Sequence, residues 1–234
     1  MDDLMTSLLV ILITSLLVGG LFLWLAWRKK QQTAALLSFV QQRGWEMIPI
    51  NERLVSGYRL EGVTESVSWQ YESLKTTQDT PAAPGSSEVQ TIQRWHSERI
   101  GLPNSLVAMG PKTPGSEINL NSSGMQSFIV QTALRMMLGD DAHLMNGLIQ
   151  QPYGSAEFQA HYMIWAHHLE DVRRLLSSGV EQQMLGWKGN RAVLVKLKAD
   201  GLDISLPRSA SLTPADVEKL VELGVRLVQS WQRG

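Results

Sequence analysis

The run from Leu8 to Trp27 constrains this chain more than any other feature, because it holds twenty residues without a charge. At a rise of about 1.5 Å per residue, a helix of that length measures about 30 Å, which matches a bilayer's hydrocarbon core. Trp24 and Trp27 stand at the end of the run, where amphipathic rings favour a membrane interface. The run therefore predicts one transmembrane helix and a single-pass membrane protein.

The charges that flank this run predict its direction. Asp2 and Asp3 precede it, whereas Arg28, Lys29 and Lys30 follow it at once. The positive-inside rule then places the N-terminus outside and residues 28–234 in the cytoplasm, at the inner (plasma) membrane. A cleaved signal peptide would need a basic start and a shorter apolar core. The predicted anchor residues are Leu8, Leu16, Gly19, Trp24 and Trp27, and the predicted membrane-surface basic residues are Arg28, Lys29 and Lys30.

Ser15 and Gly19 form a pair of small residues four positions apart within the run. Such spacing lets two membrane helices approach closely, so it indicates docking on another membrane protein or on a second copy. A chance pairing of small residues is the alternative. The predicted partners are therefore the lipid bilayer and a membrane protein or self.

Composition excludes several classes of function. The net charge is −1, and the chain beyond the run is nearly neutral, so there is no electrostatic footprint for nucleic acid. The chain has no cysteine, which excludes disulfides, thiolate metal sites and a cysteine nucleophile. Neither a P-loop nor a G-x-G-x-x-G motif is present, and no cofactor is predicted.

The first half of the chain predicts an anchor over 1–30, a juxtamembrane helix over 31–44 that Gly44 ends, and then one domain over 45–234. Period-two alternation predicts antiparallel strands over 58–63 and 67–74, with an entry strand over 45–50. Two further strands are expected over 91–100 and 105–109, the former at an edge of the sheet because its apolar residues are sparse. Flexible loops are expected near 78–88 and 111–124.

The second half predicts helices around the same sheet. Residues 125–138 form a methionine-rich helix that serves either as core or as an adaptable binding groove, and 142–150 form a short helix. Alternation predicts a strand over 158–166, and a helix follows over 169–177, which Gly179 closes. A hairpin turns at Ala199–Gly201, and Thr213 and Pro214 open a long C-terminal helix. An apolar stripe predicts that this helix lies across the sheet; it consists of Val217, Leu220, Val221, Gly224, Leu227, Val228 and Trp231. The fold class is thus α+β: an antiparallel sheet covered by helices.

Histidines give no convincing metal site. His161 and His167 would stand about 20 Å apart on a strand, and His161 and His168 about 10 Å apart along a helix. Glu157 and His161 have the spacing of an acid–base pair only on a helix, whereas the alternation predicts a strand. Asp140 and Asp141 are adjacent acids beyond the run. We therefore predict no catalytic and no metal-binding residue.

The eight tryptophans include one candidate for an exposed interface residue. Trp165 shares a strand face with His161 and Met163, so these three residues form the candidate interface. Burial of Trp165 under the last helix is the alternative.

The C-terminal block resembles uncharacterised bacterial membrane-anchored proteins that have a cytoplasmic domain of unknown function. The residues that carry the resemblance lie in three segments, with an echo at Tyr58–Gly62. They are Phe158, Tyr162, Ile164 and Ala166, then Val172, Leu175, Leu176 and Ser177, then Val180, Met184 and Leu185. These are packing positions over about the last eighty residues. The resemblance implies the fold and brings no catalytic residue.

These observations favour a membrane-anchored cytoplasmic interaction module, a non-catalytic scaffold or accessory subunit of a larger membrane protein complex. The first alternative is a membrane-tethered hydrolase or metal-dependent enzyme that uses His167, His168, Asp171 or the pair Asp140–Asp141. The second is a lipid or hydrophobic-ligand binding protein with a groove near Met136 and Met137.

Overall fold

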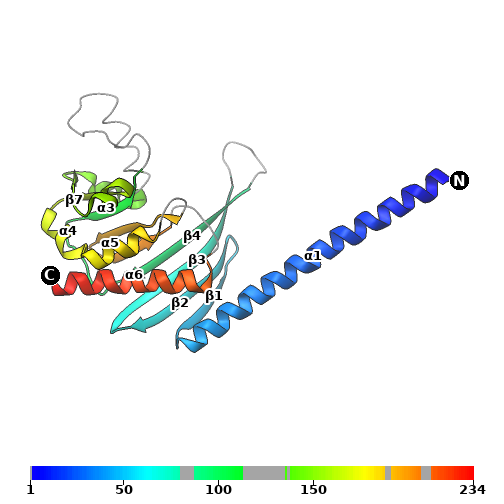
Figure 1. Ribbon diagram of the computed structural model, residues 1–234, viewed down its shortest axis with the longest axis horizontal. Helices are drawn as coiled ribbons and strands as arrows, with labels where there is room; N and C mark the ends of the chain where they lie inside the picture. The colour runs from blue at the N-terminus through cyan, green and yellow to red at the C-terminus, as the bar shows by residue number, and fades with distance from the viewer. Residues whose placement is uncertain (1, 80–86, 113–134, 136–137, 188–190, 207–211) are drawn as a thin grey trace, which may run out of the picture. The chain divides into compact units, whose positions relative to one another are not determined.

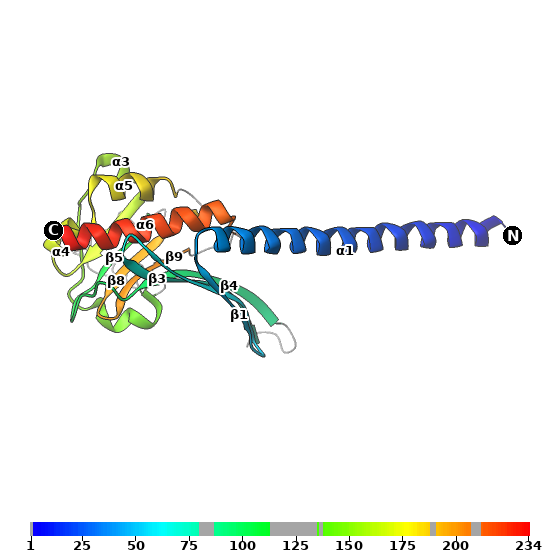
Figure 2. The same ribbon diagram turned by 90° about the horizontal axis from the view of Figure 1, so that it is seen from below.

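The computed structural model describes residues 2–79, 87–112, 135, 138–187, 191–206 and 212–234 (Figures 1 and 2). Within these ranges, the side chains of residues 2–14, 17, 26, 29, 32, 78, 79, 87, 88 and 140 lie outside the description. The chain divides into two compact units, Met1–Gly44 and Trp45–Gly234. Residues 113–124 of the loop predicted over 111–124 lie outside the described residues, and so do 125–134, 136 and 137 of the methionine-rich segment predicted over 125–138.

The first unit is one helix, α1 (Asp2–Gln42), so the helix predicted over 31–44 is the end of a longer one. Gly44 ends it with a φ of +68°, a left-handed conformation that glycine adopts without a Cβ penalty. The Arg43 amide donates to the carbonyl of Phe39 and the Gly44 amide to that of Gln41, which satisfies carbonyls of the last turn.

The prediction of a membrane anchor is wrong. A spanning helix needs about 20 successive residues that are mostly apolar, and no helix in the described part of the chain is both long enough and apolar enough to cross a membrane. The correction covers the transmembrane helix over 8–27 and the single-pass topology in the inner membrane with the N-terminus outside. The anchor residues concerned are Leu8, Leu16, Gly19, Trp24 and Trp27, and the membrane-surface residues are Arg28, Lys29 and Lys30.

The second unit is built on an antiparallel sheet, which confirms the predicted α+β class. The described residues form nine strands in the order β1-β2-β3-β4-β9-β8-β5-β7-β6. Every pair is antiparallel. The strands are β1 (Glu46–Asn51), β2 (Val55–Thr64), β3 (Val67–Asp79), β4 (Ser87–Ser97), β5 (Val107–Pro111), β6 (Ile149–Gln150), β7 (Tyr162–Ala166), β8 (Leu194–Lys198) and β9 (Gly201–Ser205).

Most predicted strands are confirmed, and two predictions about them are wrong. β4 does not lie at an edge, because it pairs with β3 on one side and β9 on the other. The strand expected over 158–166 begins only at Tyr162, since α3 (Ala156–His161) takes the first half. Ser155 caps α3 by accepting a hydrogen bond from the Phe158 amide, which favours a helical turn over the strand.

The long C-terminal helix α6 (Pro214–Arg233) lies across one face of the sheet, here called the helix face (Figures 1 and 2). Thr213 and Asp216 form a capping box at its start, as the sequence pattern predicts for Thr213. Gly224 lets the helix approach β4 closely, because a Cβ there would stand 2.5 Å from the ring of Trp95. The predicted apolar stripe of α6 is buried.

Three short helices complete the helix face at the β7 end, namely α3, α4 (Leu169–Leu175) and α5 (Ser178–Leu185). Gly179 lies inside α5, so it does not close the preceding helix as predicted. The Tyr162 hydroxyl reaches the carbonyls of Met184 and Trp187 at 2.9 and 2.6 Å, which ties β7 to the end of α5.

The opposite face of the sheet has two different ends. At the covered end, the 3₁₀ helix η1 (Gly139–Met145) and nearby residues pack on β5 and β7. The core formed there consists of Leu106, Ala108, Leu138, Leu148, Met163 and Trp165, with Leu144 and Met145 against it. η1 and β6 take the place of the short helix predicted over 142–150. At the open end, over β1 to β4, side chains such as Ile92 are exposed at 41%.

Candidate functional site

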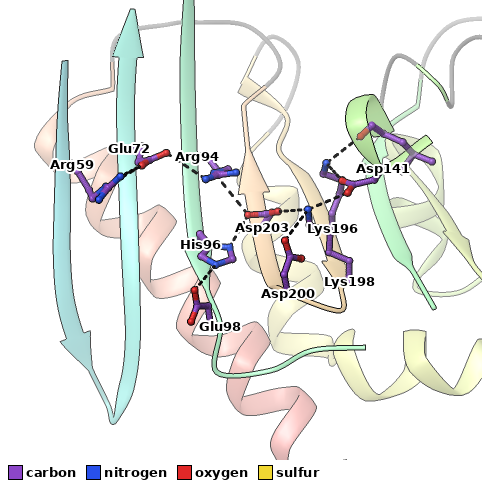
Figure 3. Close-up of polar contacts among 11 residues, drawn as sticks. Arg59, Glu72, Arg94, His96, Glu98, Asp141, Lys196, Lys198, Asp200 and Asp203 are labelled. Carbon is purple, nitrogen blue, oxygen red and sulfur yellow. Dashed lines mark hydrogen bonds and ion pairs between the residues drawn. The ribbon is translucent and has the colours of Figure 1, made fainter. Parts of the chain in front are cut away.

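A row of charged side chains crosses the opposite face of the sheet from the open end to the covered end (Figure 3). It is the strongest polar constellation among the described residues. Strand register places its members on one face, because Arg59 stands opposite Glu72, Glu72 opposite Arg94, and Asp203 opposite both His96 and Lys196. The charged row comprises Arg59, Glu72, Arg94, His96, Asp203, Lys196, Lys198 and Asp141.

At the open end, one carboxylate lies between two guanidinium groups. Arg59 Nε donates to Oε1 of Glu72 at 2.9 Å, and Arg59 Nη2 lies 2.8 Å from the same oxygen. Arg94 donates from Nη2 to the other oxygen, Oε2, at 3.4 Å. The carboxylate side chain is only 13% exposed, while Arg59 and Arg94 are 36% and 46% exposed. Glu72 therefore orients two arginines that remain in contact with solvent.

Asp203 links the two ends of the row. Its Oδ1 lies 2.9 Å from Nδ1 of His96 and 3.9 Å from Nε of Arg94, and its Oδ2 lies 3.7 Å from Nζ of Lys198. Burial by itself would raise the pKa of Asp203. The hydrogen bond with His96 and the positive charges of Arg94 and Lys198 outweigh burial and hold this pKa below its ordinary value of 3.8.

At the covered end, Asp141 of η1 lies between two lysines of β8. Lys196 Nζ donates to Asp141 Oδ2 at 2.6 Å, and Lys198 Nζ donates to Oδ1 at 3.0 Å. Burial opposes the charge on Asp141, but the two lysine hydrogen bonds prevail and lower its pKa. Burial likewise opposes the charge on Lys198, yet Asp141 and Asp200 raise its pKa above 10.5. These ion pairs fasten η1 to the sheet.

A pocket of about 320 Å³ lies beside these lysines. Its polar lining consists of Asn104, Ser105, Asp141, His143, Lys198 and Asp200. The charges in this lining bind one another, since Lys198 pairs with Asp141 at 3.0 Å and with Asp200 at 3.2 Å. The lining of the pocket thus serves to hold η1 in place.

Ser105, which lines this pocket, lies near His167 and Asp171, but the three residues do not form a catalytic triad. The Ser105 hydroxyl lies between the other two, 3.4 Å from His167 Nδ1 and 3.5 Å from Asp171 Oδ2. In a triad the carboxylate instead orients the histidine. The Leu106 amide donates to His167 Nδ1 at 3.1 Å, and His167 Nε2 bonds the Asn146 carbonyl at 2.9 Å. Both ring nitrogens of His167 therefore hold the main chain.

The three residues of the predicted interface do not share an exposed surface. Trp165 and Met163 are buried at 2% and 8% in the core of the covered end. His161 is exposed and belongs to α3, where its Nδ1 lies 3.0 Å from the Glu157 carbonyl. Trp165 is thus buried under the segment around η1, on the face opposite to α6.

The other candidate residues are scattered. His168 is the exposed N-cap residue of α4, and the Asp140 side chain lies outside the described residues. Glu157 and His161 lie on one helix, α3, so the strand that alternation predicts for both residues is wrong. Across the described residues, no three histidine or acidic side chains gather closely enough to hold a metal ion.

Comparison of the chain with protein-family models, with curated proteins and with solved structures yields no match. These comparisons therefore supply no activity, partner or site residue. The charged row has to be interpreted from its own geometry.

Sequence reasoning missed the charged row because its members come from five strands and one 3₁₀ helix. Asp141 and Lys196 are separated by 55 residues, and Arg94 and Asp203 by more than a hundred. One signal was available in the strands themselves. Charges recur at alternate positions, as in Arg59 and Glu61, Arg94 and His96, or Lys196 and Lys198, which indicates a polar sheet face.

Proposed function

We propose that the unit Trp45–Gly234 is a non-catalytic interaction module that binds another protein through the open end of its opposite sheet face. The surface concerned, here called the open patch, consists of Ile48, Arg59, Leu74, Ile92 and Arg94. The observation that carries the proposal is the composition of this patch, in which three aliphatic side chains, one exposed and two half-buried, are neighbours of two arginines on four paired strands.

Register supports the open patch as one surface. Ile48, Arg59, Glu72 and Arg94 are successive cross-strand partners from β1 to β4. Leu74 and Ile92 are partners in the next row of the same face. Ile92 is 41% exposed, and Ile48 and Leu74 are half-buried. The buried core of a protein interface is more apolar than its rim, and arginine is enriched in interfaces whereas lysine and aspartate are depleted.

The contacts of the other polar cluster favour this proposal over a hydrolase. Both ring nitrogens of His167 bond main-chain groups, namely the Leu106 amide and the Asn146 carbonyl. His167 therefore joins the start of β5 to the turn before β6. The pocket beside Ser105 is lined by charges that already pair with one another. The open patch, by contrast, presents side chains to solvent on a rigid sheet.

Site-specific photo-cross-linking in the full chain tests the proposal. A photoreactive amino acid would replace Ile92 in the open patch and, as the matched control, the exposed Glu222 on α6. We expect one protein to cross-link from position 92 and not from position 222. An excess of unlabelled full chain should compete that product away, and an excess of the Ile92→Asp variant should not. Identical products from both positions would show that the open patch binds nothing specific.

A further inference from the structure

Both arginines of the open patch are held in a fixed orientation by Glu72, which a surface that only docks a partner does not need. Glu72 binds both of them through different oxygens, so neither guanidinium is free to rotate away. Arg59 directs two nitrogens to one oxygen of Glu72. The long side chains of arginine usually lose conformational entropy when they bind a partner. Here that loss has already occurred within the protein.

The outer surface of the patch is positive because its basic side chains are more exposed than its acidic ones. The side chains of Glu72 and Asp203 are 13% and 4% exposed, whereas those of Arg59 and Arg94 are 36% and 46% exposed. The acids therefore lie beneath the bases. A guanidinium carries five N–H donors, and Arg94 uses one of them in its hydrogen bond with Glu72. Donors thus remain on the outer side of the pair for an acceptor on a partner.

We infer that Arg59 and Arg94, held by Glu72, form a clamp for carboxylate groups on an acidic protein segment that also carries apolar side chains. The inference rests on the proposed function and names its partner chemistry. Planar guanidinium groups bind carboxylates with short, charge-assisted hydrogen bonds, often in pairs. Ile92 and Leu74 lie one row away on the same face and would contact the apolar side chains of the same segment.

The surroundings of the clamp favour carboxylate from a protein over phosphate from nucleic acid. Acidic residues stand on both sides of it: Glu61 lies 3.7 Å from Arg59, and Glu98, which is 84% exposed, lies beside His96. A polyanion would meet these charges, which repel it at close range. A protein segment with a few acids can place them on the arginines and put uncharged residues elsewhere.

Fluorescence anisotropy with the full chain tests this inference. The probe is a short labelled peptide rich in glutamate and leucine, and its controls are the same peptide with glutamine for glutamate and a labelled duplex DNA. The protein variants are Arg59→Gln with Arg94→Gln, and, as the matched control, the exposed Arg173→Gln with Arg226→Gln on α4 and α6. We expect the patch variant to bind the acidic peptide at least about tenfold more weakly, whereas the control variant binds it like the wild type.

Each outcome of this experiment decides a separate point. Weak binding of the glutamine peptide and of DNA by the wild type supports a clamp for protein carboxylates. Tighter binding of DNA than of the acidic peptide overturns it in favour of phosphate. Equal affinity of the two arginine double variants for the acidic peptide also overturns it. The proposed function survives either failure if the cross-link from position 92 persists, and it fails without that cross-link.

Discussion

The two ends of the opposite sheet face repeat one arrangement with different consequences. At each end a carboxylate with little exposure binds two cations: Glu72 binds Arg59 and Arg94, and Asp141 binds Lys196 and Lys198. At the covered end the lysines are only 16% and 17% exposed, because η1 lies over them.

The two ends differ in the element that supplies the carboxylate. Asp141 belongs to η1, so its ion pairs join a separate segment to the sheet. Glu72 and its two arginines all belong to neighbouring strands that the sheet already pairs. The same chemistry therefore stabilises the fold at one end and orients exposed donors at the other. Substitutions at the covered end should cost stability, and those at the open end should cost binding.

Removal of one large side chain from each end gives the largest expected contrast. Trp165→Ala should lower the free energy of unfolding by about 3–5 kcal/mol, because it empties the core under η1. Ile92→Ala should lower it by less than about 1 kcal/mol, since the side chain is 41% exposed. Urea unfolding followed by tryptophan fluorescence and circular dichroism measures both values. Equal losses would mean that the open patch is also a packed core.

The second largest contrast in stability is expected when each of the two bridging carboxylates is replaced by alanine. Asp141→Ala should cost about 1–3 kcal/mol, because Lys196 and Lys198 then keep their charges near η1 with fewer partners. Glu72→Ala should cost no more than about 1 kcal/mol, as its arginines can turn to water. The same urea measurements apply, with Asp200→Ala, an exposed acid that pairs with Lys198, as the control at the covered end. A larger loss for Glu72→Ala would reverse the comparison.

The pH dependence of stability should sharpen the contrast further. The folded pKa of Asp141 lies below 3.8, so its contribution is present above that pH and is lost as pH falls through the lowered pKa. The folded pKa of Lys198 lies above 10.5, so its contribution is present below that pH and is lost as pH rises through the raised pKa. Asp141→Asn should therefore show a smaller fall in stability between pH 6 and about pH 3 than the wild type. Parallel curves would contradict a stabilising role for the charge on Asp141.

Local patterns in the sequence account for the elements whose signals are local. Thr213, Pro214 and an apolar stripe predicted α6, and Ala199–Gly201 predicted the β8–β9 hairpin. The run from Leu8 to Trp27 predicted a helix, which α1 confirms, but its apolar character led to the wrong prediction of a membrane crossing. In residues 158–166, alternation predicts a strand throughout, whereas the Ser155 cap starts a helix that continues to His161.

The charged row and the covered core depend on strand order and register, which single-sequence periodicity leaves undetermined. Alternation predicts that Arg94 and His96 share a face, but not that Asp203 lies opposite His96. Trp165 illustrates the same limit. Alternation places it on one strand face with His161, which favours exposure, whereas the residues that bury it come from around η1.

The smallest expected effect on stability belongs to the arginines of the open patch. Arg59→Gln and Arg94→Gln should each change the free energy of unfolding by about 0.5 kcal/mol or less, because exposed ion pairs contribute little and glutamine keeps an amide donor near Glu72. The same two substitutions remove the donors that we propose for partner binding. A variant with unchanged urea midpoint and a loss of about tenfold in affinity for the acidic peptide would separate binding from folding. A fall in stability comparable to that of Asp141→Ala would instead place the arginines among the residues that hold the sheet together.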